Sequence, residues 1–356
     1  MASATDAHPD ACTIDPLHAT TSAPDDEDEA LTTQETPAPS SWPIAAAMIN
    51  FAGPLPDGTL VQDAPPEAWQ DPLQQVADVG FDLVDPTDSW LRLADLTPER
   101  LTAFVDIMHG VGLELGGIST ARRSVIDAQR GDEYLDYSHR LIDTAAELGV
   151  ADVSFGLFQD LTPEQKQALW FWTVEGHHDA EDPELWQRAV SRFQELGRHG
   201  AEVGVHLSLE MYEDTYLGTA ESSVRFVTDI GSDHVWLNPD IGNMQRLHRP
   251  VEHWQLMLDL TLPYTRYWHV KNYLRTEDAT TGAIVTAPVP MELGVINYRA
   301  AVRQAIALGF EGTFLCEHYG GDGLTVCGTN KTYLERILPP RPAAGTHPTP
   351  QKGAAS

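Results

Sequence analysis

Short apolar runs alternate with longer segments that carry apolar residues on one helical face, and this alternation fills the middle of the chain. The runs predict strands at Pro43–Phe51, Gly80–Val84, Leu113–Ser119, Ala151–Phe158, Val203–Glu210, His234–Asn238, Tyr267–Val270 and Gly312–Glu317. The longer segments predict helices near Glu67–Val79, Pro98–Gly110, Asp132–Leu148, Pro183–Gly200, Glu221–Ile230, Val251–Leu260, Tyr298–Leu308 and Lys331–Ile337. Glycine follows several of these helices, as helix ends favour.

Eight consecutive strand–helix units indicate a parallel sheet with helical crossovers, and eight strands are the number that closes a barrel. The alternative is an open, doubly wound sheet, but no glycine-rich phosphate loop follows the first strand. We therefore expect an α/β fold, a (β/α)₈ TIM barrel over residues 43–339.

The two ends of the chain differ from this middle part in composition. Residues 1–42 hold nine acidic residues and no lysine or arginine, and they include the run Asp25–Glu29, which repels itself in a compact state. Residues 340–356 are poor in apolar residues and rich in Pro, Gly and Ala. We expect a disordered acidic tail at 1–42 and a short disordered tail at 340–356.

Charge and cysteine content limit the classes of partner. The formal net charge of −31 argues against nucleic acid and anionic membranes, because both need a basic face. The three cysteines form no disulfide framework and no CxxC pair, and no signal peptide or membrane-length apolar run is visible. These features predict a cytoplasmic protein whose partner is a small molecule.

Ligand-type side chains stand at the ends of four consecutive predicted strands. These residues are Glu210, Asp240, His269 and Glu317. Because active-site residues of such barrels sit at the carboxyl ends of the strands, we expect the four to meet on one rim. Three crowded carboxylates repel each other unless a cation or shared protons neutralise them. The set predicts one divalent metal, with Mn²⁺ expected first and Mg²⁺, Co²⁺ or Zn²⁺ as alternatives.

The motifs around these residues resemble the xylose isomerase-like barrel superfamily, in the sugar isomerase and epimerase branch that includes the D-tagatose 3-epimerase family. The resemblance spans about 43–339 and rests on Leu209–Glu210, Asn238–Asn243, Trp268–Asn272 and Cys316–His318. It implies metal binding by Glu210, Asp240, His269 and Glu317, and proton exchange by the two glutamates. It also implies that Arg275, six residues after the metal histidine, binds substrate.

The sequence departs from the epimerase pattern in two places. Asn243 stands where those enzymes often have a histidine, and the fourth strand–helix loop, about 159–182, is unusually long. That loop carries Trp172, His177 and His178, and long loops at this end of a barrel commonly cover or bind the substrate. We expect a sugar to be contacted by Asn243, Lys271, Arg275, Trp172 and His318.

The long loop and the phrase Trp268–Arg275 also resemble the large subunit of bacterial C-glycoside deglycosidases, which work with a small second subunit. That resemblance implies a lyase acting on 3-oxo-glycosides, and the alternative is an isomerase or epimerase of free or phosphorylated sugars. In both, a metal stabilises the charge that forms when a base takes a proton beside a carbonyl. The candidate bases are Glu210, Glu317, His177 and His178, and the sequence does not choose among them.

Three further readings are weaker or rest on analogy. The endonuclease IV branch of the same barrel needs more histidine ligands and a nucleic-acid partner, which the early strands and the charge oppose. A non-catalytic carbohydrate-binding barrel fits an incomplete ligand set better than this complete one. Assembly as a homo-oligomer is an expectation by analogy with related barrels.

Overall fold

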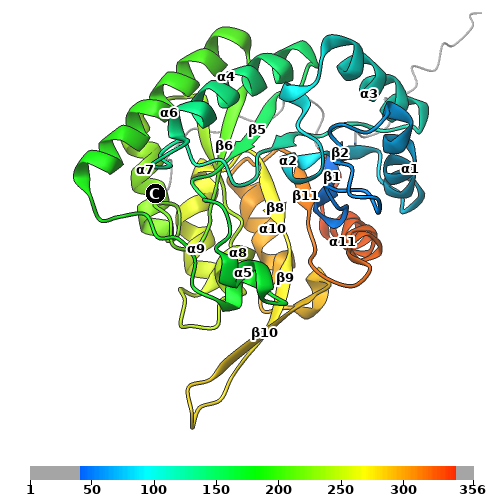
Figure 1. Cartoon of the computed structure of the whole chain (residues 1–356). Coiled ribbons are helices and arrows are strands. Elements are labelled where there is room, and N and C mark those ends of the chain that lie inside the picture. The colour runs from blue at the N-terminus through cyan, green and yellow to red at the C-terminus, as the bar shows by residue number, and fades with distance from the viewer. Residues whose placement is uncertain (1–40, 342–356) are drawn as a thin grey trace, which may run out of the picture. The chain divides into compact units, whose positions relative to one another are not determined.

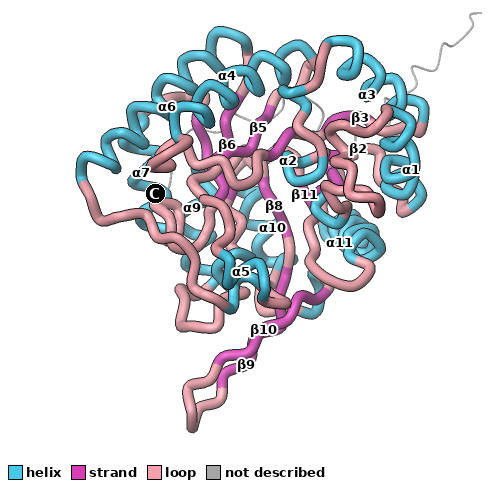
Figure 2. Tube along the Cα trace, viewed as in Figure 1, coloured by secondary structure: helices cyan, strands magenta, loops and turns pink. Residues whose placement is uncertain are grey.

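The computed structural model describes residues 41–341, and these residues form the predicted barrel. Its strands run parallel in two sheets, one of five strands in the order β3-β2-β1-β11-β8 and one of four in the order β4-β5-β6-β7. The barrel strands are β1 (Ile44–Ala47), β2 (Leu83–Asp85), β3 (Glu114–Leu115), β4 (Ile118–Ser119), β5 (Asp152–Phe155), β6 (His206–Glu210), β7 (Val235–Asn238), β8 (Trp268–Val270) and β11 (Phe314–Cys316). Helices surround the strands (Figures 1 and 2).

The eight predicted helices are all present in the described residues. They are α1 (Gln70–Asp78), α3 (Pro98–Gly110), α4 (Gly131–Glu147), α6 (Pro183–Val203), α7 (Ala220–Ile230), α9 (Trp254–Thr261), α10 (Tyr298–Ala307) and α11 (Gly323–Ile337). The last begins earlier than predicted, because the Asp322 side chain accepts the N–H of Thr325 and caps the helix. Short helices α2 (Thr87–Trp90), α5 (Pro163–Gln167) and α8 (Gly242–Gln245) lie in loops. None of the described helices is long and apolar enough to span a membrane.

The third predicted strand is divided into β3 and β4 by Gly116 and Gly117. A Cβ atom on Gly117 would lie 2.6 Å from the ring of Tyr267, so the chain passes too close to that ring for any side chain. The two sheets are therefore continuous through the backbone at this point. At the other junction, between β7 and β8, a single bridge pairs Leu237 with Thr265.

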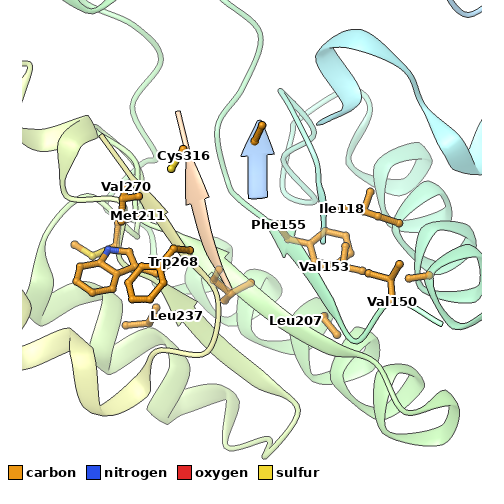
Figure 3. Close-up of a cluster of buried hydrophobic side chains, with 14 of the residues drawn as sticks. Ile118, Val150, Val153, Phe155, Leu207, Met211, Leu237, Trp268, Val270 and Cys316 are labelled. Carbon is orange, nitrogen blue, oxygen red and sulfur yellow. The ribbon is translucent and has the colours of Figure 1, made fainter. Parts of the chain in front are cut away.

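Alternation along the strands separates two apolar clusters. Trp268, Val270 and Cys316 belong to the large cluster between strands and helices, part of which Figure 3 shows. Tyr267 and Leu315 belong to a small cluster with Ala45 and Ala47, in which Ala45 is the partner of Leu315 in the parallel register. Because successive side chains of a strand face opposite ways, His269 points to the side of the strand opposite Trp268 and Val270.

The expected boundary of the acidic tail differs from the structure, and one connection between a strand and a helix forms strands of its own. Trp42, which we assigned to the acidic tail, is buried at 9% exposure and donates its indole N–H to the carbonyl of Pro339. The segment between β8 and α10 contains a hairpin of β9 (Asn272–Glu277) and β10 (Ile284–Val289) that projects away from the barrel (Figure 1). The disorder predicted within 1–40 and 342–356 lies outside the described residues.

Gly312 offers a test of the close approach between β8 and β11. A Cβ atom there would lie 1.7 Å from the carbonyl oxygen of Arg266, a backbone atom that has no freedom to move aside. We expect Gly312→Ala to lower the free energy of unfolding by about 3 kcal/mol, at the upper end for overpacked sites. Gly110→Ala is the control, because nothing lies within 4 Å of its added Cβ. Equal denaturation midpoints for the two variants would contradict this account.

Candidate metal centre

The four predicted ligands come from four neighbouring strands of the barrel. Glu210 is the last residue of β6, Asp240 lies two residues beyond β7, His269 lies within β8, and Glu317 follows β11. Because the strands are parallel, their carboxyl ends share one rim, which brings the four side chains together. All four are buried, with exposures between 0% and 8%.

The side chains converge on Nδ1 of His269. That atom lies 3.2 Å from Oε1 of Glu317, 3.6 Å from Oε2 of Glu210 and 3.9 Å from Oδ2 of Asp240. Nδ1 of His269 and Oδ1 of Asp240 are both buried without a hydrogen-bond partner. Buried polar atoms are seldom left unpaired, and these separations suit donor atoms that share one cation at about 2.1 Å. Glu210, Asp240 and His269 each offer a ligand atom within 4.8 Å of the other two, so these three donors fit a divalent metal, and Glu317 lies 3.2 Å from His269 beside them.

The other nitrogen of His269 is held by a chain of hydrogen bonds. Nε2 lies 3.2 Å from Oγ of Ser119, whose hydroxyl donates to Oδ2 of Asp85 at 2.6 Å. The hydroxyl of Tyr267 donates to the same carboxylate oxygen at 2.9 Å. Such partners orient a ligating imidazole and leave its other nitrogen free for the metal. Our sequence analysis missed Asp85 and Ser119, although both end predicted or observed early strands and the strand-end rule applies to them too.

Two residues predicted to bind sugar contact the candidate metal ligands. Lys271 is 2% exposed, and its ammonium pairs with Oδ2 of Asp240 and, at 2.5 Å, with Oε2 of Glu317. Asn243 donates its amide N–H to Oε1 of Glu210 at 2.9 Å and to the carbonyl of Met211. Both residues therefore position carboxylates of the candidate metal centre, and Lys271 also offsets part of their charge.

Burial and neighbouring charges shift the pKa values of Glu210, Glu317 and His269 by different amounts and in different directions. Burial raises the pKa of Glu210 to about 7, against the opposing pull of His269. Burial also disfavours the charged form of Glu317, but Lys271 and His269 outweigh it and hold the pKa of that carboxyl well below its usual range. Burial lowers and the facing carboxylates raise the pKa of His269, which reaches about 9. A cation bound here has to displace that proton, because a ligating imidazole is neutral.

Two cavities adjoin the centre. The metal pocket, of about 70 Å³, is lined by Glu210, His269 and Glu317 together with loop residues that include Arg122. The outer pocket, of about 230 Å³, is lined by the long loop after β5 and by the segments that follow β6 and α8. Trp172 and His177 line the outer pocket and not the metal pocket.

The remaining predicted residues lie away from the metal pocket. His178 is half exposed and pairs with Glu175 at 3.1 Å and Asp214 at 3.5 Å. His318 is buried beside Glu317 but lines neither pocket. Arg275 lies on β9, where its guanidinium donates to the backbone carbonyls of residues 245, 247 and 249. The structure thus uses Arg275 to fasten a loop and does not bring it to the proposed ligands.

A different arginine is buried near the site. Arg246 is 0% exposed, donates to both carboxylate oxygens of Glu213 at 2.8 Å, and lies 4.9 Å from the ring centre of Phe171 and 5.1 Å from that of Trp172. Its Nε and Nη1 have no hydrogen-bond partner. Nothing in the apolar pattern marks this loop residue, so sequence reasoning had no signal for it.

Asp179, in the wall of the outer pocket, allows a test of pH dependence. Burial raises the pKa of Asp179 from 3.8 to about 6, while the N–H that Tyr216 donates opposes the shift. A raised pKa means that the folded state binds this proton more tightly, so the stabilisation is complete below about pH 4 and is lost as the pH rises through about 6. Asp179→Asn keeps the shape and removes the titration. We expect the free energy of unfolding of the wild type, relative to this variant, to fall by up to about 3 kcal/mol between pH 4 and 7. A constant difference across that range would refute the assignment.

The chain is similar to several solved barrel proteins. A xylose isomerase-like TIM barrel protein from Mycobacterium smegmatis, solved in complex with magnesium, is 46% identical, with a TM-score of 0.81 over 84% of this chain and 97% of that one. An L-ribulose 3-epimerase is 18% identical, with a TM-score of 0.59 over 84% and 95%. A 3-keto-D-glucoside 4-epimerase from E. coli is 14% identical, with a TM-score of 0.57 over 83% and 100%.

The more distant of these likenesses show the fold alone, and no curated protein matches the chain by sequence. The family itself is shown by a match that covers residues 73–337 and by the 46% identity to the mycobacterial protein. The chain belongs to the xylose isomerase-like TIM-barrel family.

Proposed function

We propose that this protein is a divalent-metal-dependent sugar isomerase or epimerase that moves a proton on the carbon beside a sugar carbonyl. The observation that carries the proposal is the convergence of three carboxylates on Nδ1 of His269, with that nitrogen and Oδ1 of Asp240 unpaired and buried. A divalent cation at this point supplies stabilisation for the negative charge that builds on the carbonyl oxygen. The 46% identical family member was solved with magnesium, which supports a metal in this barrel.

Glu210 and Glu317 are the bases we assign to the reaction. Both line the metal pocket, whereas His177 lines the outer pocket and His178 is bound to Glu175 and Asp214. One carboxylate takes the proton from carbon, and the electron pair passes to the carbonyl oxygen. Return of a proton to the opposite face inverts the carbon, and its return to the neighbouring carbon exchanges aldose for ketose. Lys271 holds Glu317 ionised for the first step, because the ammonium lies 2.5 Å from its carboxylate.

Proton exchange in heavy water tests this proposal directly. The manganese-loaded protein is incubated in D₂O with a panel of pentoses, hexoses and their phosphates, and deuterium beside the carbonyl is read by NMR and mass spectrometry. We expect incorporation with the wild type and a loss of at least about 100-fold with Glu317→Gln, since general bases contribute about 10²–10⁴-fold. Glu311→Gln, in the loop before β11, is the control. Absence of exchange with every sugar, or full exchange by Glu317→Gln, would overturn the assignment.

A C-glycoside deglycosidase-type lyase is the second candidate. It is favoured by the outer pocket beside the metal pocket, which gives room for a leaving group. The same proton removal would then be followed by departure of the group attached to the sugar. Incubation with 3-oxo-glycosides, with and without a small partner subunit, distinguishes the two functions, because only the lyase releases the free aglycone.

A further inference from the structure

A pair of histidines joins two helices on the outside of the barrel and shares no residue with the candidate metal centre. Helices α4 and α6 pack against each other and lie side by side in Figure 1. Nδ1 of His139, on α4, lies 2.8 Å from Nδ1 of His199, on α6. The ring centres lie 5.0 Å apart, farther than the nitrogens, so the two rings meet through their Nδ1 edges.

A carboxylate holds the other nitrogen of each ring. Nε2 of His139 lies 3.0 Å from Oε1 of Glu195, and Nε2 of His199 lies 2.8 Å from Oδ1 of Asp143. An ionised carboxylate only accepts hydrogen bonds, so each Nε2 carries the hydrogen and donates it. This fixes the tautomer of both rings and leaves their Nδ1 lone pairs facing each other. Carboxylates orient metal-binding imidazoles in the same way.

The space between the two Nδ1 atoms requires a positive charge. Two lone pairs repel each other at 2.8 Å, so the contact needs either a shared proton or a cation between them. The flanking carboxylates of Glu195 and Asp143 add two negative charges to this chain of four groups. In the described part of the protein, neither carboxylate forms an ion pair with a lysine or an arginine. Both therefore favour a positive charge between the rings.

The spacing of these residues along the two helices places all four in register. His139 and Asp143 lie four residues apart on α4, and Glu195 and His199 lie four residues apart on α6. Residues with this spacing occupy the same helix face, one turn apart. Each histidine consequently meets the carboxylate of the other helix, and the two rings meet on the diagonal between them. The arrangement is thus built by two rigid elements and does not depend on a loop.

We propose that His139 and His199 bind a transition-metal ion, with Zn²⁺ expected first, that links α4 to α6. Imidazole nitrogens suit Zn²⁺, Cu²⁺ and Ni²⁺, whereas Mn²⁺ prefers oxygen ligands and does not compete for this pair. Zinc holds its nitrogen ligands at about 2.0–2.1 Å in a tetrahedron, which places two of them about 3.3 Å apart, so the rings need to part by only about 0.5 Å. Their side chains are 28% and 19% exposed, which lets water complete the coordination. Metal binding releases the shared proton.

Calorimetric titration with Zn²⁺ tests the proposal on the full chain, prepared without a histidine tag. The Asp240→Ala variant is the starting protein, because it lacks a proposed ligand of the other centre, and we expect it to bind a single Zn²⁺ per chain. Adding His199→Gln removes a ligand and should weaken zinc binding by more than about 100-fold. Adding Glu195→Gln removes only an orienting partner and should weaken it by about 10–100-fold. His109→Gln, at an exposed histidine of α3, is the control and should leave the affinity unchanged.

Thermal unfolding gives a second readout. Zinc should raise the unfolding midpoint of Asp240→Ala and leave that of the Asp240→Ala, His199→Gln protein in place, because a ligand stabilises the native state that binds it. Asp143→Asn covers the case in which His199→Gln folds poorly, since it keeps both rings and should weaken zinc binding by about 10–100-fold. Asp240→Ala protein that binds no zinc, or that binds it equally well with and without His199→Gln, would overturn the proposal. Neither result depends on the proposed activity toward sugars.

Discussion

Asp240→Ala should abolish tight binding of a divalent cation, with an affinity loss greater than about 100-fold. Loss of a residue that merely orients a ligand costs about 10–100-fold, and Asp240 is itself one of the proposed ligands, with a buried oxygen that has no other partner. Without the cation, proton exchange on any sugar substrate should fall to background. Metal content after reconstitution, measured by elemental mass spectrometry, and titration calorimetry give the two readouts.

The control for this variant lies at the opposite end of the same strand. Asp233 is exposed just before the amino end of β7, whereas Asp240 follows its carboxyl end, so Asp233→Ala removes an equal charge far from the proposed ligands. We expect Asp233→Ala to bind one cation as the wild type does. A folded Asp240→Ala protein that retains wild-type metal affinity would show that the four-residue centre is not the metal site.

Lys271→Met should lower the free energy of unfolding of the metal-free protein by about 3–5 kcal/mol. The variant leaves Asp240 and Glu317 buried without the ammonium that pairs with both, and removing one partner of a buried ion pair has about this cost. A cation neutralises the same carboxylates, so added Mn²⁺ should stabilise the variant more than it stabilises the wild type. Chemical denaturation with and without metal measures both effects.

Lys331→Met serves as the matched control for that loss. Lys331 also pairs with a carboxylate, Glu335 at 2.5 Å, but that glutamate is 50% exposed and the pair spans one turn of α11. Exposed pairs of this kind contribute less than about 1 kcal/mol. Similar unfolding midpoints for Lys271→Met and Lys331→Met in chelator would show that Lys271 does not offset the charge of the centre.

The barrel, and the convergence of the four candidate ligands on one rim, could be predicted because they follow from periodic features. Strand–helix alternation gave the order of elements, and the carboxyl ends of parallel strands must share a rim, so Glu210 and Glu317 had to approach each other although 107 positions separate them in the chain. The same rule would have found Asp85 and Ser119, which hold the far nitrogen of His269, if it had been applied to the early strands.

Some residues have roles that depend on the direction in which their side chains point, and these roles could not be predicted from periodic features. Arg275 has the spacing of a substrate-binding arginine, but the β9–β10 hairpin turns it toward backbone carbonyls. Nothing in the sequence distinguishes Lys271 from other lysines, and only the structure shows that its ammonium pairs with two carboxylates. Arg246 lies in a loop without any apolar period, so its burial against Glu213 depends on contacts between distant segments.

The strands β7 and β8 share little backbone pairing, and for this reason a bound cation would affect the barrel as well as the site. The backbone there is joined by the bridge of Leu237 with Thr265, and the Asn238 side chain accepts the N–H of His269 at 2.8 Å in place of a strand partner. Glu210 and Asp240 follow strands on one side of this junction, and His269 and Glu317 belong to strands on the other. A cation bound by these four proposed ligands would therefore link the two sheets across this junction. Binding of the cation to the folded protein alone would then raise the free energy of unfolding of the barrel, because a ligand that binds only the native state stabilises it.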